Sequence, residues 1–453
     1  MNLKRKLWWA QHRTDVYKYG TIISLVLIVT ISIIYFTYSK FTSTSEATAY
    51  ETTVEPFIKN DYFIASYIDG EWSNEIPGKE DGYAVDKIVC DNGATATWDN
   101  EEWGINIRNA TKKIKCSIYF KKLVKFTDQI TNLASTDTTN FATDDPDNNI
   151  RYIGRDPSNY VYFNCSDYSK QTEDTCEKWR IIGLFNNVQK SNNIQENLIK
   201  ITRNNLIGTF SFDSSEKEVN NGYGTNDWSN SALMKLLNPG YETEEVGGSL
   251  YYNLKAGNCY SGAEKNIKEC DFTASGLKND STRNAIESVQ WNLGASDNGI
   301  TSSLYKNERS TKVYSGHATT WTGKIGLPYS SDYGYATSGG TTKTRESCLS
   351  SDLTSWGTPI ETCSTNNYIT FYQFTMTPYL SNNYDEFYIY MAGKTRSFLY
   401  YKLYINSESL TNGVTLRNIK GILGVSPTLY LKSDIFVLAG DGSSSNPYQL
   451  KLN

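Results

Sequence analysis

One stretch of the chain shows no alternation of apolar and polar positions. Residues 19–39, with the sequence YGTIISLVLIVTISIIYFTYS, carry no charged side chain between Lys18 and Lys40. At roughly 1.5 Å of rise per residue, a helix of this length covers about 30 Å, which is the thickness of the hydrocarbon core of a bilayer. The pattern therefore predicts one transmembrane helix at residues 19–39.

The residues that precede this stretch indicate how the helix is oriented. Residues 1–18 contain five basic side chains and one acidic side chain, Asp15. A short basic flank stays on the cytoplasmic side of a membrane, which predicts a cytoplasmic tail at 1–18 and an extracellular C-terminal part. The alternative is a cleaved signal peptide, because Ala47-Thr48-Ala49 has a small-x-small pattern. The apolar stretch is longer than the about 7 to 15 residues of a signal peptide, which favours an uncleaved signal-anchor.

The pattern after the predicted helix indicates a tether and a small domain. Residues 40–50 are rich in Ser, Thr and Ala without periodicity, and they predict a short tether. In residues 51–122, short runs of apolar residues alternate at period two between turn signals such as Asp81-Gly82. Such alternation is typical of half-buried strands. We therefore predict a small antiparallel β module at residues 51–122.

Residues 123–453 combine helical and strand patterns. Helices are predicted at residues 126–133, after Ser229 or Ser231, and after Asp280 or Ser281 with Ile286 and Val289 on one face. Strands are predicted at residues 160–163, 179–185, 197–205, 387–391, 398–405 and 428–437. Helices in the middle and strands at both ends predict one larger α+β domain that closes by pairing its two ends.

Charge and cysteine content narrow the class of protein. The net charge is −5, and subtracting the +4 of residues 1–18 leaves about −9 on the predicted extracellular part. An acidic surface argues against binding to nucleic acid. All eight cysteines follow the predicted helix without a Cys-x-x-Cys motif, which indicates disulfides rather than zinc or redox chemistry. Pairing in sequence order predicts the bridges Cys90–Cys116, Cys165–Cys176, Cys259–Cys270 and Cys348–Cys363.

Catalytic patterns are scarce in the sequence. His317 is the one histidine beyond the predicted helix, which excludes a two-histidine metal site there and leaves no catalytic residue to assign. Residues 142–149, ATDDPDNN, contain calcium-type ligands but not the alternating order of a calcium loop. We interpret them as an acidic turn and expect no metal and no cofactor. A carboxylate pair for glycoside hydrolysis stays open, because it depends on a separation in space.

Aromatic residues beside turns are the remaining candidates for a binding site. Trp228, Trp321, Asp332 and Tyr333 lie in segments that join an aromatic residue to a turn rather than to a regular apolar period. Aromatic side chains offer faces and polar edges against which sugars or partner side chains pack. We take these four residues as a hypothetical binding face for an extracellular glycan or protein ligand.

Several segments carry a resemblance to known proteins. They include YIG from Tyr152, WRIIGLF from Trp179, NDWSNSALMKLLNPGY from Asn226, WTGKIGL from Trp321 and SDYGYA from Ser331. These segments resemble a group of uncharacterised membrane-anchored surface proteins of low-GC Gram-positive bacteria. The C-terminal region is distantly similar to a domain of unknown function with the C-type-lectin-like fold of formylglycine-generating enzymes. That pattern places a Trp before Thr-x-Thr/Ser-Pro and an Arg before a late proline, where this chain has Phe374 and Ser426, so it implies an altered ligand site.

These observations favour a single-pass, membrane-anchored extracellular protein that binds a glycan or a protein without catalysis, in the manner of an adhesin. Two alternatives stay open. An exported carbohydrate-active hydrolase would turn over a glycan through its acidic residues, whereas a structural component of the cell envelope would self-associate or bind other envelope proteins.

Overall fold

The computed structural model divides the chain into two compact units, Met1–Asp61 and Tyr62–Asn453. The residues that the structure describes are 8, 12–14, 17–30, 62–79, 81–100, 102–109, 113–213, 225–261, 267–353, 356, 363–369, 373–380, 388–392, 399–400 and 422–452.

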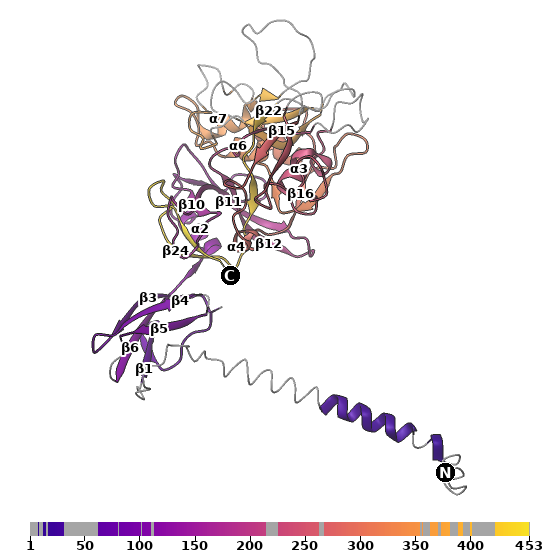
Figure 1. Ribbon diagram of the computed structural model, residues 1–453. Helices are drawn as coiled ribbons and strands as arrows, with labels where there is room; N and C mark the ends of the chain where they lie inside the picture. The colour runs from indigo at the N-terminus through magenta and orange to yellow at the C-terminus, as the bar shows by residue number, and fades with distance from the viewer. Residues whose placement is uncertain are drawn as a thin grey trace. The chain divides into compact units, whose positions relative to one another are not determined.

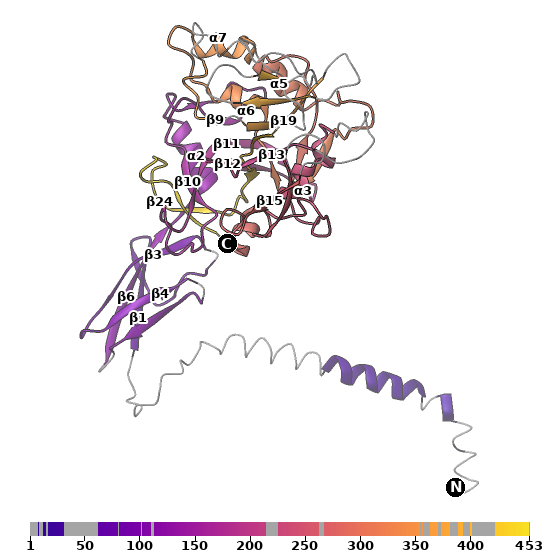
Figure 2. The same cartoon turned by 45° about the horizontal axis from the view of Figure 1, so that its top comes forward.

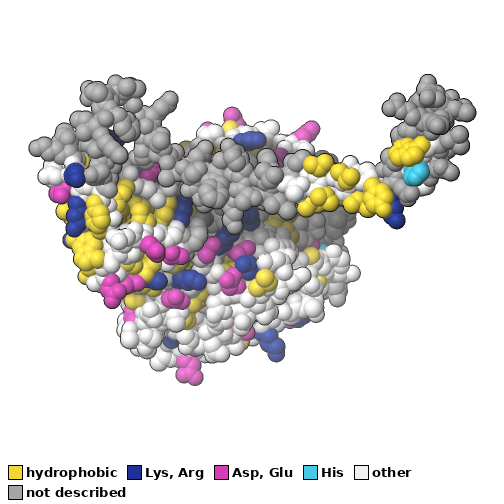
Figure 3. All heavy atoms as spheres, turned by 90° about the horizontal axis from the view of Figure 1, so that it is seen from below, with side chains coloured by type: hydrophobic (Ala, Val, Ile, Leu, Met, Phe, Trp, Pro, Cys, Tyr) yellow, Lys and Arg dark blue, Asp and Glu magenta, His cyan; other side chains and the backbone are white. Residues whose placement is uncertain are grey.

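In the first unit, residues 17–30 are helical and exposed. Their surface is largely hydrophobic (Figure 3) and includes Ile22, Leu25 and Ile28. Among the described residues, no helix is both long and apolar enough to cross a bilayer. The second part of the predicted span, residues 31–39, and the predicted tether at 40–50 lie outside the described residues. The transmembrane helix therefore stays a prediction.

The second unit begins with the predicted β module. Its strands are β1 (Tyr62–Ile68), β2 (Glu71–Ser73), β3 (Tyr83–Cys90), β4 (Thr95–Asp99), β5 (Gly104–Arg108) and β6 (Ile114–Lys122). One sheet has the order β2-β1-β6-β3, and β4 pairs with β5 as a separate hairpin. The prediction of an antiparallel module is wrong for one pair, because β1 and β6 run parallel. The other strands of the module connect them, and so long a connection allows the chain to re-enter the sheet in the same direction.

The inner face of this module follows the period of two in the sequence. Ile114, Cys116, Ile118 and Phe120 of β6 are buried, while Lys115 between them is exposed. The hairpin covers that face, with the rings of Trp98 and Phe120 edge to face at 5.5 Å. Such aromatic contacts stabilise a small core beyond the area that they bury.

The larger α+β part is built on a seven-stranded sheet. Its long central pair is β11 (Glu177–Gln189) and β12 (Gln195–Arg203), which are antiparallel. The sheet order is β18-β23-β12-β11-β9-β8, with β10 also on β11; the flanking strands are β8 (Phe141–Ala142), β9 (Ile150–Tyr152), β10 (Tyr160–Phe163), β18 (Ile325–Gly326) and β23 (Thr428–Tyr430). Helix α2 (Phe126–Ala134) lies beside β10 and β11 in both views (Figures 1 and 2).

Smaller sheets complete this part. One has the order β13-β22-β19-β20-β21 and contains β13 (Thr209–Ser211), β19 (Gln373–Tyr379), β20 (Tyr388–Ala392), β21 (Leu399–Tyr400) and β22 (Ile422–Gly424). Two hairpins are β14 (Ala256–Tyr260) with β15 (Ile267–Asp271), and β16 (Val289–Asn292) with β17 (Thr320–Gly323). A last sheet joins the two ends of the domain and contains β7 (Val124–Lys125), β24 (Phe436–Ala439) and β25 (Gln449–Lys451). The predicted α+β class and the pairing of its two ends are confirmed.

The helices confirm some predicted boundaries and correct others. They are η1 (Trp228–Asn230), α3 (Ala232–Leu237), α4 (Asp280–Ala285), α5 (Thr301–Glu308), α6 (Ser330–Tyr335) and α7 (Arg345–Ser350). Ser231 caps α3 as predicted, with its side chain accepting from the Met234 N–H. The predicted cap of α4 is wrong, because Asn279 accepts from the Thr282 N–H instead.

The predicted boundaries are wrong for one further helix, α4, and for the strand predicted at 428–437. The helix α4 ends at Ala285, because Ile286 forms a β-bridge with Leu431 and Val289 begins β16. The single strand predicted at 428–437 is two strands, β23 in the central sheet and β24 in the terminal sheet. They are separated by residues 431–435, which include the polar residues 432–434. Of the strand predicted at 398–405, only 399–400 lie within the described residues.

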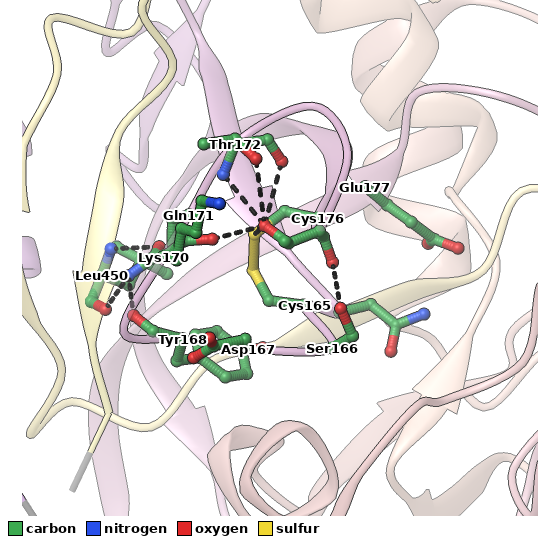
Figure 4. Close-up of a disulfide and its surroundings, with 12 residues drawn as sticks. Cys165, Ser166, Asp167, Tyr168, Lys170, Gln171, Thr172, Cys176, Glu177 and Leu450 are labelled. Atoms are coloured by element: carbon green, nitrogen blue, oxygen red, sulfur yellow. Dashed lines mark hydrogen bonds between the residues drawn. A yellow bond between two sulfur atoms is a disulfide. The ribbon is translucent and has the colours of Figure 1, made fainter.

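All four predicted disulfides are confirmed. Cys90 and Cys116 face each other across β3 and β6. The Cys165–Cys176 bridge closes the loop between β10 and β11 (Figure 4), and Gln171 of that loop exchanges hydrogen bonds of 2.7 and 2.8 Å with the backbone of Leu450. The bridge therefore holds a loop that anchors the C-terminal strand β25.

A close approach between strands makes Gly183 a point where stability can be tested. A Cβ atom there would lie 2.1 Å from the backbone oxygen of Ile150 on the paired strand β9. We expect Gly183→Ala to lower the free energy of unfolding by about 1–3 kcal/mol, because backbone must shift to admit the methyl group. Gly104→Ala is the control, since its Cβ atom would have only an ordinary contact, 3.9 Å from the Glu102 oxygen. Urea unfolding that gives equal midpoints for both variants would contradict this prediction.

Candidate functional site

A network of buried charges lies next to a pocket that is lined by described residues. Asp332, in the first turn of α6, is its centre. One carboxylate oxygen of Asp332 accepts from Arg151 Nη1 at 2.7 Å and the other from Lys200 Nζ at 2.5 Å. All three side chains are at most 1 % exposed. Ion pairs this deeply buried are rare and costly. One donor of this network, Arg151 Nη2, is buried without a hydrogen-bond partner among the described residues.

Asp145 provides the second carboxylate of the network. It accepts from Arg151 Nε at 2.7 Å and from the side chain of Asn149 at 2.9 Å. The acidic segment at 142–149 thus turns one carboxylate inward, where donors of the protein occupy its oxygens. Among the described residues, no group of acidic, histidine or cysteine side chains is arranged to hold a metal ion.

The strand and helix positions explain why these charges meet. Arg151 lies on β9, and Lys200 interrupts the apolar run of β12 at residues 198–201, LIKI. The N-terminus of α6 is fixed above them by Glu308, whose carboxylate accepts from the Ser331 N–H at 3.0 Å and from Thr377 Oγ1 at 2.7 Å. Burial raises the pKa of Glu308 above its ordinary value.

The electrostatics of the network are asymmetric. Burial opposes the charge on Asp332, but Lys200 and Arg151 outweigh it and hold the pKa of that carboxyl at about 2. Burial lowers the pKa of Lys200 to about 8, against the attraction of Asp332. Asp332 faces two cations, whereas Lys200 shares its one anion with Arg151, so the carboxylate gains more from the cluster than the ammonium does.

Aromatic rings separate the Lys200 ammonium from the solvent. The ring centres of Tyr329, Phe185, Trp291 and Tyr430 lie 4.3, 5.3, 5.3 and 5.5 Å from Lys200 Nζ. Cations over aromatic faces are attracted by the quadrupole of the ring. The same four rings also line a pocket of about 190 Å³.

Apart from Val188, the other residues that line the pocket carry polar groups. Tyr305, Arg309 and Asp147 form one wall: Arg309 stacks over the Tyr305 ring at 3.3 Å, and the Tyr305 hydroxyl donates to Asp147 at 2.6 Å. The amide side chains in the lining are Asn149, Asn186, Asn187, Gln189, Gln290 and Asn292. The aromatic rings of the lining are at most 6 % exposed, so the amides and the guanidinium provide most of its accessible groups. Such polar groups are suited to a small ligand with several hydroxyl groups.

The structure does not bring the four sequence-predicted binding residues to one exposed face. Trp228 and Tyr333 are fully buried, Asp332 is 1 % exposed, and Trp321 is partly buried. The rings of Trp228 and Trp321 meet edge to face at 6.1 Å. Tyr333 packs against Trp356 at 5.7 Å. Asp332 belongs to the buried charged network and does not line the pocket.

The structure shows the environments of His317 and of Phe374, one of the positions singled out by the resemblance. His317 is half-buried, and burial lowers its pKa against the charge of Asp227. Phe374 is buried on β19, and the Thr375 and Thr377 hydroxyls that follow it lie 3.0 Å from Ser330 Oγ and 2.9 Å from the Ser330 nitrogen. The Thr-x-Thr-Pro segment therefore holds the start of α6 in place.

Sequence reasoning missed Arg151, Lys200 and the amides of the pocket. The sequence does contain a signal for Lys200, because this charged residue lies between the apolar residues Ile199 and Ile201 of a predicted strand. The chain matches no protein-family model, no curated protein and no solved structure at a significant level.

The buried network predicts a specific dependence of stability on pH. Asp332→Asn should lower the free energy of unfolding by about 3–5 kcal/mol at pH 7, because two buried cations lose their carboxylate. The folded pKa of about 2 lies below the ordinary 3.8. The stabilisation is thus complete above pH 4 and is lost as the pH falls towards 2, so wild type and variant should converge there.

Asp297→Asn serves as the control for this measurement. Asp297 pairs with Lys312 at 2.7 Å, and both side chains are about half exposed at 48 % and 47 %. An exposed pair contributes at most about 1 kcal/mol. If urea unfolding gives equal losses for Asp332→Asn and Asp297→Asn at pH 7, the network has no special role in stability.

Proposed function

We propose that the chain is a membrane-anchored extracellular protein that binds a single sugar unit of a glycan, without catalysis, in the pocket above Lys200. The observation that carries this proposal is the lining of the pocket, which combines aromatic rings, Arg309 and amide side chains. Among the amides, Asn187 and Gln290 are exposed, whereas the side chain of Asn149 is used by hydrogen bonds within the protein. Sugars present both apolar C–H faces and hydroxyl groups, and this lining offers a partner to each.

The size of the pocket favours a glycan over a protein partner. Its volume of about 190 Å³ is below the about 300–1,000 Å³ of pockets that enclose drug-sized molecules. A single small unit fits such a space, whereas a protein partner would need a broad surface of about 800 Å² on each side.

The acidic residues at the pocket argue against glycoside hydrolysis. Within the described lining, Asp147 is the one carboxylate, and it accepts from Tyr305. The common hydrolytic mechanisms need two carboxyl groups on opposite sides of the scissile bond. The buried carboxyl groups of Asp332 and Glu308 do not line the pocket. Binding without turnover therefore agrees better with this arrangement than hydrolysis.

Location outside the cell is supported by the cysteines and by the sequence at 19–39. All eight cysteines are paired, and disulfides persist in oxidising compartments. The uncharged stretch at 19–39 would anchor the chain, with residues 1–18 in the cytoplasm. The resemblance to surface proteins of Gram-positive bacteria and to C-type-lectin-like domains agrees with this assignment.

The pocket amides allow a direct test with the full chain. The protein is applied to a broad glycan array, and the tightest glycan is measured by calorimetry against the double variant Gln290→Ala/Asn292→Ala. We expect affinity to fall about tenfold, since two hydrogen bonds of ordinary strength are removed. Gln290 is exposed and Asn292 partly exposed, so the substitutions should leave the fold intact.

Gln195→Ala is the matched control, because Gln195 is an exposed amide residue on β12 that does not line the pocket. Glycan binding that survives the double variant unchanged would place the ligand elsewhere. Release of sugar from an array hit would support the hydrolase alternative. A blank array together with self-association of the chain would support a structural role in the envelope.

A further inference from the structure

Arg180 is a buried guanidinium whose hydrogen-bonding edge is not used. The residue lies on β11 and is 5 % exposed. Its Nε and Nη2 atoms are buried and have no hydrogen-bond partner among the described residues. Unpartnered buried donors are uncommon, and a buried charge without a partner is costly. Burial accordingly lowers the pKa of this guanidinium below its ordinary value.

The same edge is filled in two other arginines of this chain. Arg203 donates from Nε and Nη2 to the two oxygens of Glu177 at 2.9 and 3.0 Å. Arg345 donates in the same way to Asp144, at 2.8 Å for both bonds. Paired N–H groups on one edge of a guanidinium match the two oxygens of a carboxylate. Arg180 presents this fork with no carboxylate in it.

The ring stacking around Arg180 fixes its orientation. Its guanidinium lies 3.8 Å from the ring centre of Tyr160 and 5.2 Å from that of Tyr368. The nearest acidic group, Asp156, is 61 % exposed, and its Oδ1 lies 3.7 Å from Nη2, beyond hydrogen-bond distance. The aromatic contacts therefore hold the cation in place, while the available counter-charge only approaches it.

Other unsatisfied groups share the recess in front of Arg180. The recess is lined by Arg180, Thr202, Arg203, Tyr368, Gln373 and Ser426, among others. The Tyr368 hydroxyl and the Gln373 side-chain oxygen are also buried without a hydrogen-bond partner among the described residues. The cavity volume of about 10 Å³ admits about one water-sized group, so only the tip of a ligand can enter.

We propose that this recess is a binding site for the carboxylate group of an acidic ligand, held by the Nε–Nη2 fork of Arg180 and by the Tyr368 hydroxyl. The two oxygens of a carboxylate would pair with the two unused N–H groups, as those of Glu177 and Asp144 do at the other two arginines. The phenolic hydroxyl would donate a third hydrogen bond. The site is separate from the pocket above Lys200, and the inference does not depend on glycan binding there.

The experiment titrates the full chain with ¹³C-labelled acetate and with glucuronate, and follows binding by NMR line broadening. The sodium salts of chloride, sulfate and phosphate, at equal ionic strength, supply the anions for comparison. We expect saturable binding of both carboxylates. Arg180→Lys keeps the charge but removes the fork, and should weaken acetate binding about tenfold. Tyr368→Phe keeps the ring and removes one donor, and should weaken binding about three- to tenfold.

Asp156→Asn tests whether the exposed neighbour occupies the fork. If Asp156 competes with the ligand, the variant should bind acetate as tightly as wild type or more tightly. Tyr368→Phe has the same shape as wild type, so it decides the matter even if Arg180→Lys does not fold. Acetate binding that is unchanged in Tyr368→Phe would overturn the proposal, and so would unchanged binding in a folded Arg180→Lys. So would sulfate or phosphate binding without acetate binding, or no saturable binding of any carboxylate.

Discussion

The ion pairs of Asp332 with Lys200 and Arg151 are the interaction on which the α+β part depends. They join α6 to two strands of the central sheet, β12 and β9, at a place where all three side chains are excluded from water. Each charge is costly to bury alone, so the three elements must assemble together. The position of α6 then follows, with Glu308 and the Thr375–Thr377 segment fixing its N-terminus.

The pocket is a consequence of how this network is covered. The aromatic rings that surround the Lys200 ammonium are also part of the lining of the pocket. Strands β11 and β16 add five of the amides, all at least partly exposed, whereas the sixth, Asn149, is buried. A rigid, charged foundation and an adaptable polar rim are the features expected of a binding site for a small polar molecule.

Sequence patterns predicted what is local and missed what is not. The disulfides link cysteines that are close in sequence, and the cap of α3 is a single serine before an apolar face. Both features could therefore be predicted from the sequence. The end of α4 could not be predicted in this way, because Ile286 forms a β-bridge with Leu431, which is distant in sequence. Asp332 was selected for its aromatic neighbours, but its partners, Arg151 and Lys200, are distant in sequence. Their pairing is a property of the folded sheet, which periodicity does not reveal.

The most direct measurement is a crystal structure of the full chain with its tightest glycan from the array. A sugar ring in contact with Trp291 or Tyr305, and hydrogen-bonded to the amides of the pocket, is the result that the account predicts. A glycan bound at another surface, with the pocket above Lys200 holding only water, would contradict it.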